Sequence, residues 1–176
     1  VLPAAAKLQV SSDGGVHWSD ATVTSKAWSI GLTQLDGSKT YQVRVIDGIG
    51  NVDLNTASYA VTVDIVAPVV SVTSETSNNA NTRYAKIGDT ITAAFTSTDN
   101  VDSVTIGRRA ATVVHGTGNS YTASYQVVDG DNGVPMNVVV NSSDAAGNTT
   151  TATLASAVTA DTIAPAIPIF SLGTGV

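Results

Sequence analysis

The sequence predicts an all-β protein made of small β-sandwich domains in tandem, and three observations lead to this prediction. Charged residues make up only 12% of the 176 residues, and Thr, Ser, Ala, Val and Asn supply much of the rest. Such a chain is rich in β-branched residues and poor in the long polar side chains that cover helix surfaces. Alternating apolar and polar runs recur between Gly- and Asp-rich turns. The third observation is an internal repeat.

The segment Asp47–Pro68 recurs as Asp144–Pro165, displaced by 97 residues without a gap. Ten of the 22 aligned positions are identical, including both Asp, the Gly-Asn pair and the Ala-Pro step. A period of about 100 residues is far longer than a solenoid repeat and fits a small β-sandwich. We therefore expect two domains, over residues 1–66 and 67–163, with 164–176 beginning a third repeat or forming a tail.

In the first domain, alternation predicts strands at Lys7–Ser11, Val16–Val23, Ala27–Leu32, Thr40–Ile46 and Ser58–Val63, with turns at Asp13–Gly15, Gln34–Lys39 and Asp47–Asn51. Tyr41, Val43 and Val45 fall on one face of their strand, and Gln42 and Arg44 fall on the other. If the period continued upstream, the preceding Ala-Pro step would lie 29 residues before Val1. The first domain is therefore expected to lack its opening strand or two, or to belong to a shorter variant. The tail Ile167–Val176 is a candidate strand donor for an incomplete sheet.

The second domain is expected to be complete. Its predicted strands are Val69–Thr73, Asp89–Thr96, Ser103–Ile106, Ala111–His115, Tyr121–Val127, Met136–Asn141 and Thr150–Thr159, with Ser74–Thr82 a polar loop and turns at Thr98–Asp102, Gly116–Asn119 and Asp129–Gly133. Seven short strands at regular turn spacing are typical of an immunoglobulin-like sandwich. Because the chain has no Cys, the antibody-type Cys–Trp–Cys pattern is absent. Ile167–Leu172 would be the first strand of a third domain.

The charge balance excludes several classes of partner. The net charge is −6 with only eight basic residues, whereas nucleic acid and anionic membrane surfaces require a dense basic face. Glu75 is the only glutamate, so Asp carries the acidity, and Asp favours turns and supplies short oxygen ligands. The chain also has no apolar run long enough to span a bilayer.

Several segments resemble bacterial immunoglobulin-like repeats. They are Thr105–Val113, Asn119–Tyr125, Ser142–Asn148 and Asp161–Pro165, and Val10–Trp18 resembles a second variant of the same repeats. These modules form long arrays in large secreted or surface-bound adhesins of Gram-negative bacteria. The resemblance implies an extracellular structural role in cell adhesion and biofilm formation. Calcium would stiffen the joints between neighbouring repeats, and distal domains would reach a host or surface glycan or protein.

The Asp-rich turns are the candidate metal ligands. Asp47 and Asp144 each begin an Asp-x-x-Gly-Asn turn, for which an Asx turn alone explains every residue type. The alternative is calcium ligation, because carboxylates converging where two domains abut would repel without a cation. The expected calcium ligands are Asp64 and Asp36 of the first domain and Asp99, Asn100, Asp102, Asp144 and Asn148 of the second. Asp161 is expected to play the part of Asp64 at the next joint, near Asp129, Asp131 or Asn132.

Residues Ser11, Asp13, Gly15 and Trp18 match the Asp-box pattern of sialidase propellers, where it is a structural hairpin. A propeller needs several copies and this chain has one, so we expect a hairpin lock, with glycan binding as the alternative. The sequence offers no catalytic constellation, because His17 and His115 fall in different domains without a Ser/Asp partner set. We therefore expect no enzyme.

The main rival is a pair of carbohydrate-binding modules attached to a secreted polysaccharide-active protein. An aromatic row on one exposed sheet face would favour it. Tyr41, Tyr59, Tyr121 and Tyr125 all fall inside alternating strands, however, and are expected in the core.

Overall fold

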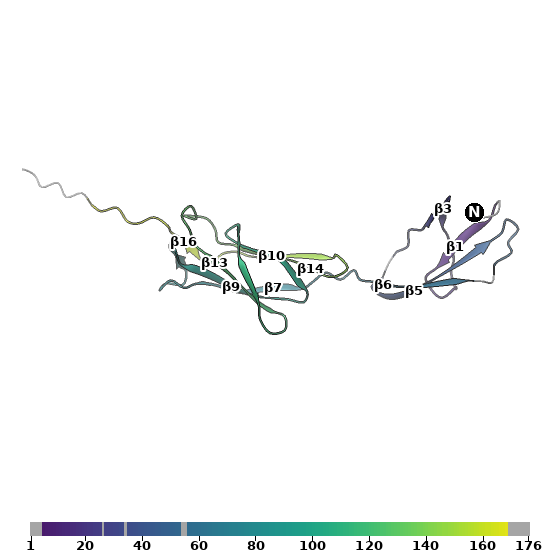
Figure 1. Cartoon of the computed structure of the whole chain (residues 1–176), viewed down its shortest axis with the longest axis horizontal. Helices are drawn as coiled ribbons and strands as arrows, with labels where there is room; N and C mark the ends of the chain where they lie inside the picture. The colour runs from purple at the N-terminus through teal and green to yellow at the C-terminus, as the bar shows by residue number, and fades with distance from the viewer. Residues whose placement is uncertain (1–4, 26, 34, 54–55, 169–176) are drawn as a thin grey trace, which may run out of the picture. The chain divides into compact units, whose positions relative to one another are not determined.

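The computed structural model describes residues 5–25, 27–33, 35–53 and 56–168. Every regular element in these ranges is a strand, and the sheets are antiparallel apart from one short parallel pair (Figure 1). The predicted all-β class is confirmed. The chain divides into two compact units, Val1–Val66 (unit 1) and Ala67–Val176 (unit 2).

Unit 2 contains two four-stranded sheets. The first has the order β12-β13-β9-β7 and the second the order β11-β10-β14-β15. The strands are β7 (Val70–Ser77), β9 (Thr90–Ser97), β10 (Asn100–Ile106), β11 (Arg109–Ala110), β12 (Thr112–His115), β13 (Ser120–Gln126), β14 (Val138–Ser143) and β15 (Thr149–Leu154). A parallel pair of β8 (Tyr84–Ala85) and β16 (Thr159–Ala160) adds a short third sheet.

The core of unit 2 lies between these two sheets. Alternate residues of β9 and β13 meet alternate residues of β10 and β14, as the period of a strand requires. The cluster includes Ile91, Phe95, Ile106, Met136 and Val138, each at most 2% exposed. Unit 2 therefore contains both of the sheets that enclose its core, and it is a β-sandwich.

Unit 1 contains one four-stranded sheet, of order β2-β1-β5-β6, and a separate hairpin of β3 and β4. Its strands are β1 (Lys7–Ser11), β2 (Ser19–Asp20), β3 (Thr22–Thr24), β4 (Ala27–Ser29), β5 (Gly37–Ile46) and β6 (Ala57–Val63). The sheet has the chain order and antiparallel pairing of β11-β10-β14-β15 in unit 2. The β3–β4 hairpin follows β2 along the chain as the β12–β13 hairpin follows β11.

Several strand predictions were wrong in their bounds. The strand predicted at Ala27–Leu32 ends at Ser29, and the one predicted at Met136–Asn141 is Val138–Ser143. Residues 74–77 belong to β7 and not to the predicted loop Ser74–Thr82. A bulge between Val72 and Ser74 shifts the register, so that the polar Glu75 and Ser77 point inward. A bend at Ala157 separates β15 from β16, so the predicted strand Thr150–Thr159 is not continuous.

In unit 1, the predicted strand Val16–Val23 is reduced to β2 and β3, because Val16 and His17 belong to the Asp13 turn. The turn predicted at Gln34–Lys39 is shorter, since β5 begins at Gly37. Residues 167–168 are not part of a strand, and the remainder of the predicted strand Ile167–Leu172 and of the candidate donor tail lies outside the described residues. No helix in the described ranges is long and apolar enough to cross a bilayer.

Candidate functional site

The two Asp-x-x-Gly-Asn turns have the same hydrogen bonds. Asp144 Oδ1 accepts the backbone N–H groups of Ala146 and Asn148, both at 2.9 Å, and Asp144 Oδ2 accepts the Asn148 side-chain amide at 2.8 Å. Asp47 binds Ile49 and Asn51 in the same way. The side-chain amide of the Asn is the leading reason that the pKa of each Asp is lowered. Both turns are therefore Asx turns, as one of the two sequence interpretations predicts.

Glycine is required at the fourth position of each turn. Gly50 has φ 98° and Gly147 has φ 94°, a conformation that L side chains rarely adopt. The backbone N–H of Gly50 donates to Asp47 O at 3.2 Å, and that of Gly147 donates to Asp144 O at 3.3 Å. Both turns satisfy their own polar groups.

The Asp99–Asp102 segment and the Asp144 turn lie at the same end of the sheet β11-β10-β14-β15. Asn100 begins β10 opposite Ser143, so the turn predicted at Thr98–Asp102 is shorter than expected. Asp99 Oδ2 accepts the Thr98 hydroxyl at 2.8 Å. Asp102 Oδ1 accepts the Ser143 hydroxyl at 2.8 Å and the Asn100 amide at 3.2 Å. These carboxylates take part in local polar contacts within unit 2.

In each unit, the segment that follows the last strand is held by the same two kinds of hydrogen bond. In unit 1, Asp36 Oδ1 accepts the backbone N–H of Ile65 at 3.1 Å, and Asp64 Oδ1 accepts that of Val66 at 3.1 Å. In unit 2, the same two roles belong to Asn132, bound to the backbone N–H of Thr162, and to Asp161, bound to that of Ile163. Of the three residues expected near Asp161, Asn132 makes this contact.

Asp131, another of the three, is fully buried and has a different role. Its Oδ2 accepts the Tyr125 hydroxyl at 2.6 Å and the backbone N–H of Val128 at 2.9 Å, and its Oδ1 faces Arg109 at 3.3 Å. Burial and the hydrogen bond to Asp131 raise the pKa of Tyr125 to about 12. Asp131 therefore fastens the 128–131 turn to the core.

The structure brings some of the predicted calcium ligands near one another within a unit. Asn100 bonds to Asp102 in unit 2, and Asp36 and Asp64 bind consecutive backbone N–H groups in unit 1. In the described part of the chain, no three His, Cys, Asp or Glu side chains form a group that could hold a metal ion. Calcium binding stays a prediction.

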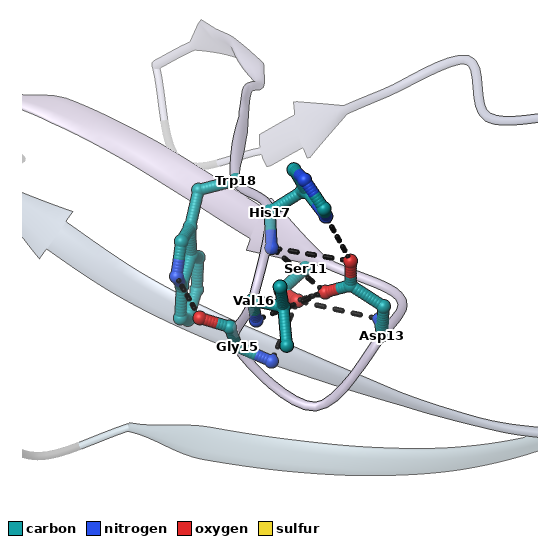
Figure 2. Close-up of polar contacts among 6 residues, drawn as sticks. All are labelled: Ser11, Asp13, Gly15, Val16, His17 and Trp18. Atoms are coloured by element: carbon teal, nitrogen blue, oxygen red, sulfur yellow. Dashed lines mark hydrogen bonds and ion pairs between the residues drawn. The ribbon is translucent and has the colours of Figure 1, made fainter.

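The Asp-box hairpin is formed as its pattern predicts (Figure 2). Asp13 Oδ1 accepts the backbone N–H groups of Val16 and His17 at 3.0 and 2.9 Å. The buried Ser11 hydroxyl donates to Asp13 at 2.7 Å and accepts the backbone N–H of Gly15 at 2.8 Å. The backbone N–H of His17, followed by the Ser11 hydroxyl, holds the pKa of Asp13 far below its usual range.

Trp18 packs against the turn of this hairpin. Its Nε1–H donates to Gly15 O at 2.8 Å, and the Arg44 guanidinium carbon lies 4.1 Å from the ring centroid. The Arg44–Trp18 contact is of the cation–π type and covers one face of the Trp18 ring. The hairpin is therefore a structural lock. The sequence pattern predicts the bonds of Asp13 to turn amides and the packing of Trp18, but not the Ser11 bonds or the Arg44 contact.

One feature that the sequence pattern does not reveal is an apolar groove in unit 1, of about 570 Å³. The side chains of Trp28, Tyr41, Tyr59, Val10, Val61 and Val63 line it. Tyr59 is 57% exposed and Trp28 is 43% exposed, so the prediction that Tyr59 is a core residue was wrong. Tyr41, Tyr121 and Tyr125 are partly buried. The alternation of β6 predicts which face Tyr59 occupies but cannot show whether anything covers that face.

Comparison with known proteins adds no family assignment. No protein-family model matches the chain. No curated protein sequence is significantly similar to it.

Proposed function

We propose that this chain is a structural extender segment of a bacterial extracellular adhesin, in which tandem immunoglobulin-like domains hold a distal binding domain away from the cell. The observation that carries the proposal is the repeated contact at the ends of the units, Asp36 with Ile65 and Asn132 with Thr162. A module used once has no need to fix the direction of its outgoing chain in a standard way. A module used in an array does.

The order of strands in unit 2 supports the immunoglobulin-like assignment. The sheet β12-β13-β9-β7 corresponds in chain order to strands D, E, B and A of a constant-type domain, and β10-β14-β15 to C, F and G. β11 extends the second sheet by one short strand. Unit 1 has the same second sheet, which supports a tandem repeat of one module type.

The segment between the two units is anchored to each of them separately. On the unit 1 side, Asp36 and Asp64 hold the backbone N–H groups of Ile65 and Val66. On the unit 2 side, Pro68 O accepts the Thr150 hydroxyl at 2.6 Å, and the Val69 N–H donates to Thr98 Oγ1 at 3.0 Å. Pro68 further restricts the backbone. Few free torsions are left, which favours a stiff linker.

Stiffness is tested by the distribution of distances between spin labels on the two units. The chain has no Cys, so Thr40→Cys and Thr117→Cys place one label on each unit at exposed positions. We expect a narrow distribution, and a broad one after residues 65–68 are replaced by Gly and Ser. Equal widths for both proteins would contradict the extender proposal.

We propose calcium as the cation that stabilises the ends of the units. Asp64, Asp36, Asp99, Asp102, Asp144 and Asp161 supply the hard oxygen ligands that calcium prefers. We expect calcium to raise the melting temperature and to narrow the label distances, with Asp64→Asn weakening both effects. Asp53→Asn, at an exposed position of unit 1 outside the predicted ligand set, is the charge-matched control. An unchanged melting temperature and unchanged distances in calcium would eliminate this part of the proposal.

A second candidate function is carbohydrate binding, and the unit 1 groove is the observation that favours it. Trp28, Tyr41 and Tyr59 give three aromatic rings on one face, and sugars stack on such rings. The other side chains that line this groove are aliphatic, however, and offer no polar groups to orient a sugar. Sub-millimolar binding on a glycan array, lost in Trp28→Ala, would favour this function over the extender.

A further inference from the structure

Unit 1 has the strands of only one of the two sheets that enclose the core of unit 2. Its sheet β2-β1-β5-β6 matches β11-β10-β14-β15 strand by strand. Its β3–β4 hairpin matches β12–β13. Among the described residues of unit 1, nothing matches β7 or β9.

Equivalent positions of the two units differ sharply in burial. Tyr41 pairs with Tyr59 in unit 1, and Val138 pairs with Leu154 at the corresponding place in unit 2. Val138 is fully buried in a core that includes Ile91 and Phe95 of β9. Tyr41, in the place of Val138, is half-buried. Tyr59, in the pairing position of Leu154, is 57% exposed, whereas Leu154 is half-buried and packs against the core. The apolar groove of unit 1 therefore occupies the position of the sandwich core.

The backbone edge of β4 points to the same missing element. In unit 2, β13 pairs with β12 on one side and with β9 on the other, from Ser120 to Gln126. In unit 1, β4 pairs with β3, and the described residues supply no strand on its other side. A strand seated there would gain main-chain hydrogen bonds as well as apolar contact.

We infer that the apolar groove of unit 1 is the docking surface for a two-stranded antiparallel ribbon of the β7–β9 type, joined in cis to the amino-terminal side of β1. Unit 2 supplies the template. There β7 and β9 precede β10 along the chain, pair with each other, and place Ile91, Ala93 and Phe95 against the opposite sheet. The ribbon would pair with β4 as β9 pairs with β13, and its apolar face would cover Trp28, Tyr41 and Tyr59.

The chemistry of the groove selects such a ribbon over a polar ligand. Trp28, Tyr59 and Val61, each more than 40% exposed, present hydrocarbon surface, for which the favourable contact is the apolar face of a strand pair. An isolated sheet with one apolar face in water is poorly stabilised, and a covering layer removes this exposure. The inference does not depend on the extender role, because it rests on unit 1 alone.

A fusion protein tests the proposal. A second copy of residues 69–99 is placed before Val1, and the accessibility of Trp28 is measured by acrylamide quenching of its fluorescence. The same proteins with Trp28→Phe supply the Trp18 signal for subtraction. In the matched control, the added copy carries Ile91→Asp and Phe95→Asp, which leaves the strands but removes their apolar face.

We expect the apolar ribbon to lower the quenching constant of Trp28 roughly twofold, because a side chain now 43% exposed becomes buried. Hydrogen exchange at the β4 amides should slow in the same protein. The Asp-bearing ribbon should change neither quantity. Equal quenching with both ribbons would overturn the proposal, and so would protection of Trp28 without protection of the β4 amides.

A second copy of the chain is the competing occupant, and light scattering distinguishes it. We expect the 176-residue chain to remain monomeric while Trp28 stays accessible. A doubling of mass with rising concentration, accompanied by protection of Trp28, would assign the groove to a homodimer and overturn the ribbon.

Discussion

The Asp36 carboxylate accepts the backbone N–H of Ile65 at 3.1 Å, 29 residues further along the chain, and thereby fixes the segment that leaves unit 1. Asn132 does the same for Thr162 in unit 2. An Asp and an Asn fill one role because the contact needs only an acceptor oxygen on a short side chain. The charge of Asp36 is thus not required for this hydrogen bond.

Asp36→Ala should free the outgoing segment, whereas Asp36→Asn should keep it fixed. The alanine variant removes the acceptor for the Ile65 N–H, and the asparagine variant keeps one. We expect faster hydrogen exchange at Ile65 in Asp36→Ala only, with the rest of unit 1 unchanged. Exchange at Ile65 that is accelerated equally in both variants would show that the charge of Asp36, and not its hydrogen bond, fixes the outgoing segment.

Acid should open the Asp-box hairpin at a pH set by Asp13. Folding lowers the pKa of this carboxyl, so its contribution to stability is present above the ordinary Asp pKa of about 3.9 and is lost as pH falls through the folded value. Trp18 fluorescence should report this acid transition. In Asp13→Asn the hairpin should be weaker at neutral pH and the Asp13 step absent. An identical acid step in the variant would assign the transition to another group.

Gly15→Ala should destabilise unit 1 more than Gly14→Ala. Both residues have positive φ, 92° and 76°, so the backbone strain is similar. A Cβ at Gly15 would lie 2.8 Å from Gln42 Oε1 and 3.4 Å from the Trp18 ring, whereas one at Gly14 meets nothing within 4 Å. We expect a difference of about 1 kcal/mol in the free energy of unfolding. Equal losses would mean that Gln42 moves aside freely.

Asp131→Ala should be among the most destabilising substitutions in unit 2. It leaves the Tyr125 hydroxyl and the Val128 N–H without their acceptor and deprives Arg109 of its ion-pair partner. We expect a loss of about 3 kcal/mol, against about 1 kcal/mol for Tyr125→Phe, which removes one hydrogen bond of the same network. Denaturant unfolding measures both. A loss in Asp131→Ala no larger than in Tyr125→Phe would contradict this role.

Glu75→Gln should stabilise unit 2 at neutral pH. Glu75 is 8% exposed. Its Oε2 accepts the Ser156 hydroxyl and the Ala157 N–H, and its Oε1 has no hydrogen-bond partner among the residues that the structure describes. Burial raises its pKa, so its contribution to stability is present below the ordinary Glu pKa of about 4.3 and is lost as pH rises through the folded value.

The gain in Glu75→Gln should therefore grow as the pH rises above the ordinary Glu pKa of about 4.3. Glutamine keeps an acceptor for Ser156 and Ala157 and carries no charge. Denaturant unfolding at several pH values measures the difference, and Glu75→Ala, which removes the acceptor, is the control and should be less stable than the wild type. A Glu75→Gln variant less stable than the wild type at pH 7 would show that the ionised form is favoured.

The sequence predicts the sheet strands well where alternation and turn residues agree. β1 has its predicted bounds, and β5, β9 and β13 lie within a few residues of theirs. The Asp-box contacts and both Asx turns also follow from local residue types, because all their hydrogen bonds join residues at most four apart.

Features that depend on distant residues could not be predicted. The sequence predicts a polar loop that includes Glu75 and Ser77. The bulge that turns these side chains inward is set by the pairing of β7 with β9, which local sequence does not show. The bend at Ala157 is held by Glu75, 82 residues away. The exposure of Tyr59 depends on which strands cover it, and alternation within β6 carries no information about its neighbours.

The Asx turns have one more consequence, for how such a module tolerates change. Three residues, an Asp, a Gly and an Asn, satisfy the polar groups of the turn, and the two positions between Asp and Gly are Gly-Ile in one copy and Ala-Ala in the other. Ile49 is 88% exposed. The position before the Gly can therefore be rewritten from copy to copy without a compensating mutation elsewhere, whereas a Cβ at Gly48 would lie 2.9 Å from the Ala5 Cβ, so that this position is tied to a neighbouring segment.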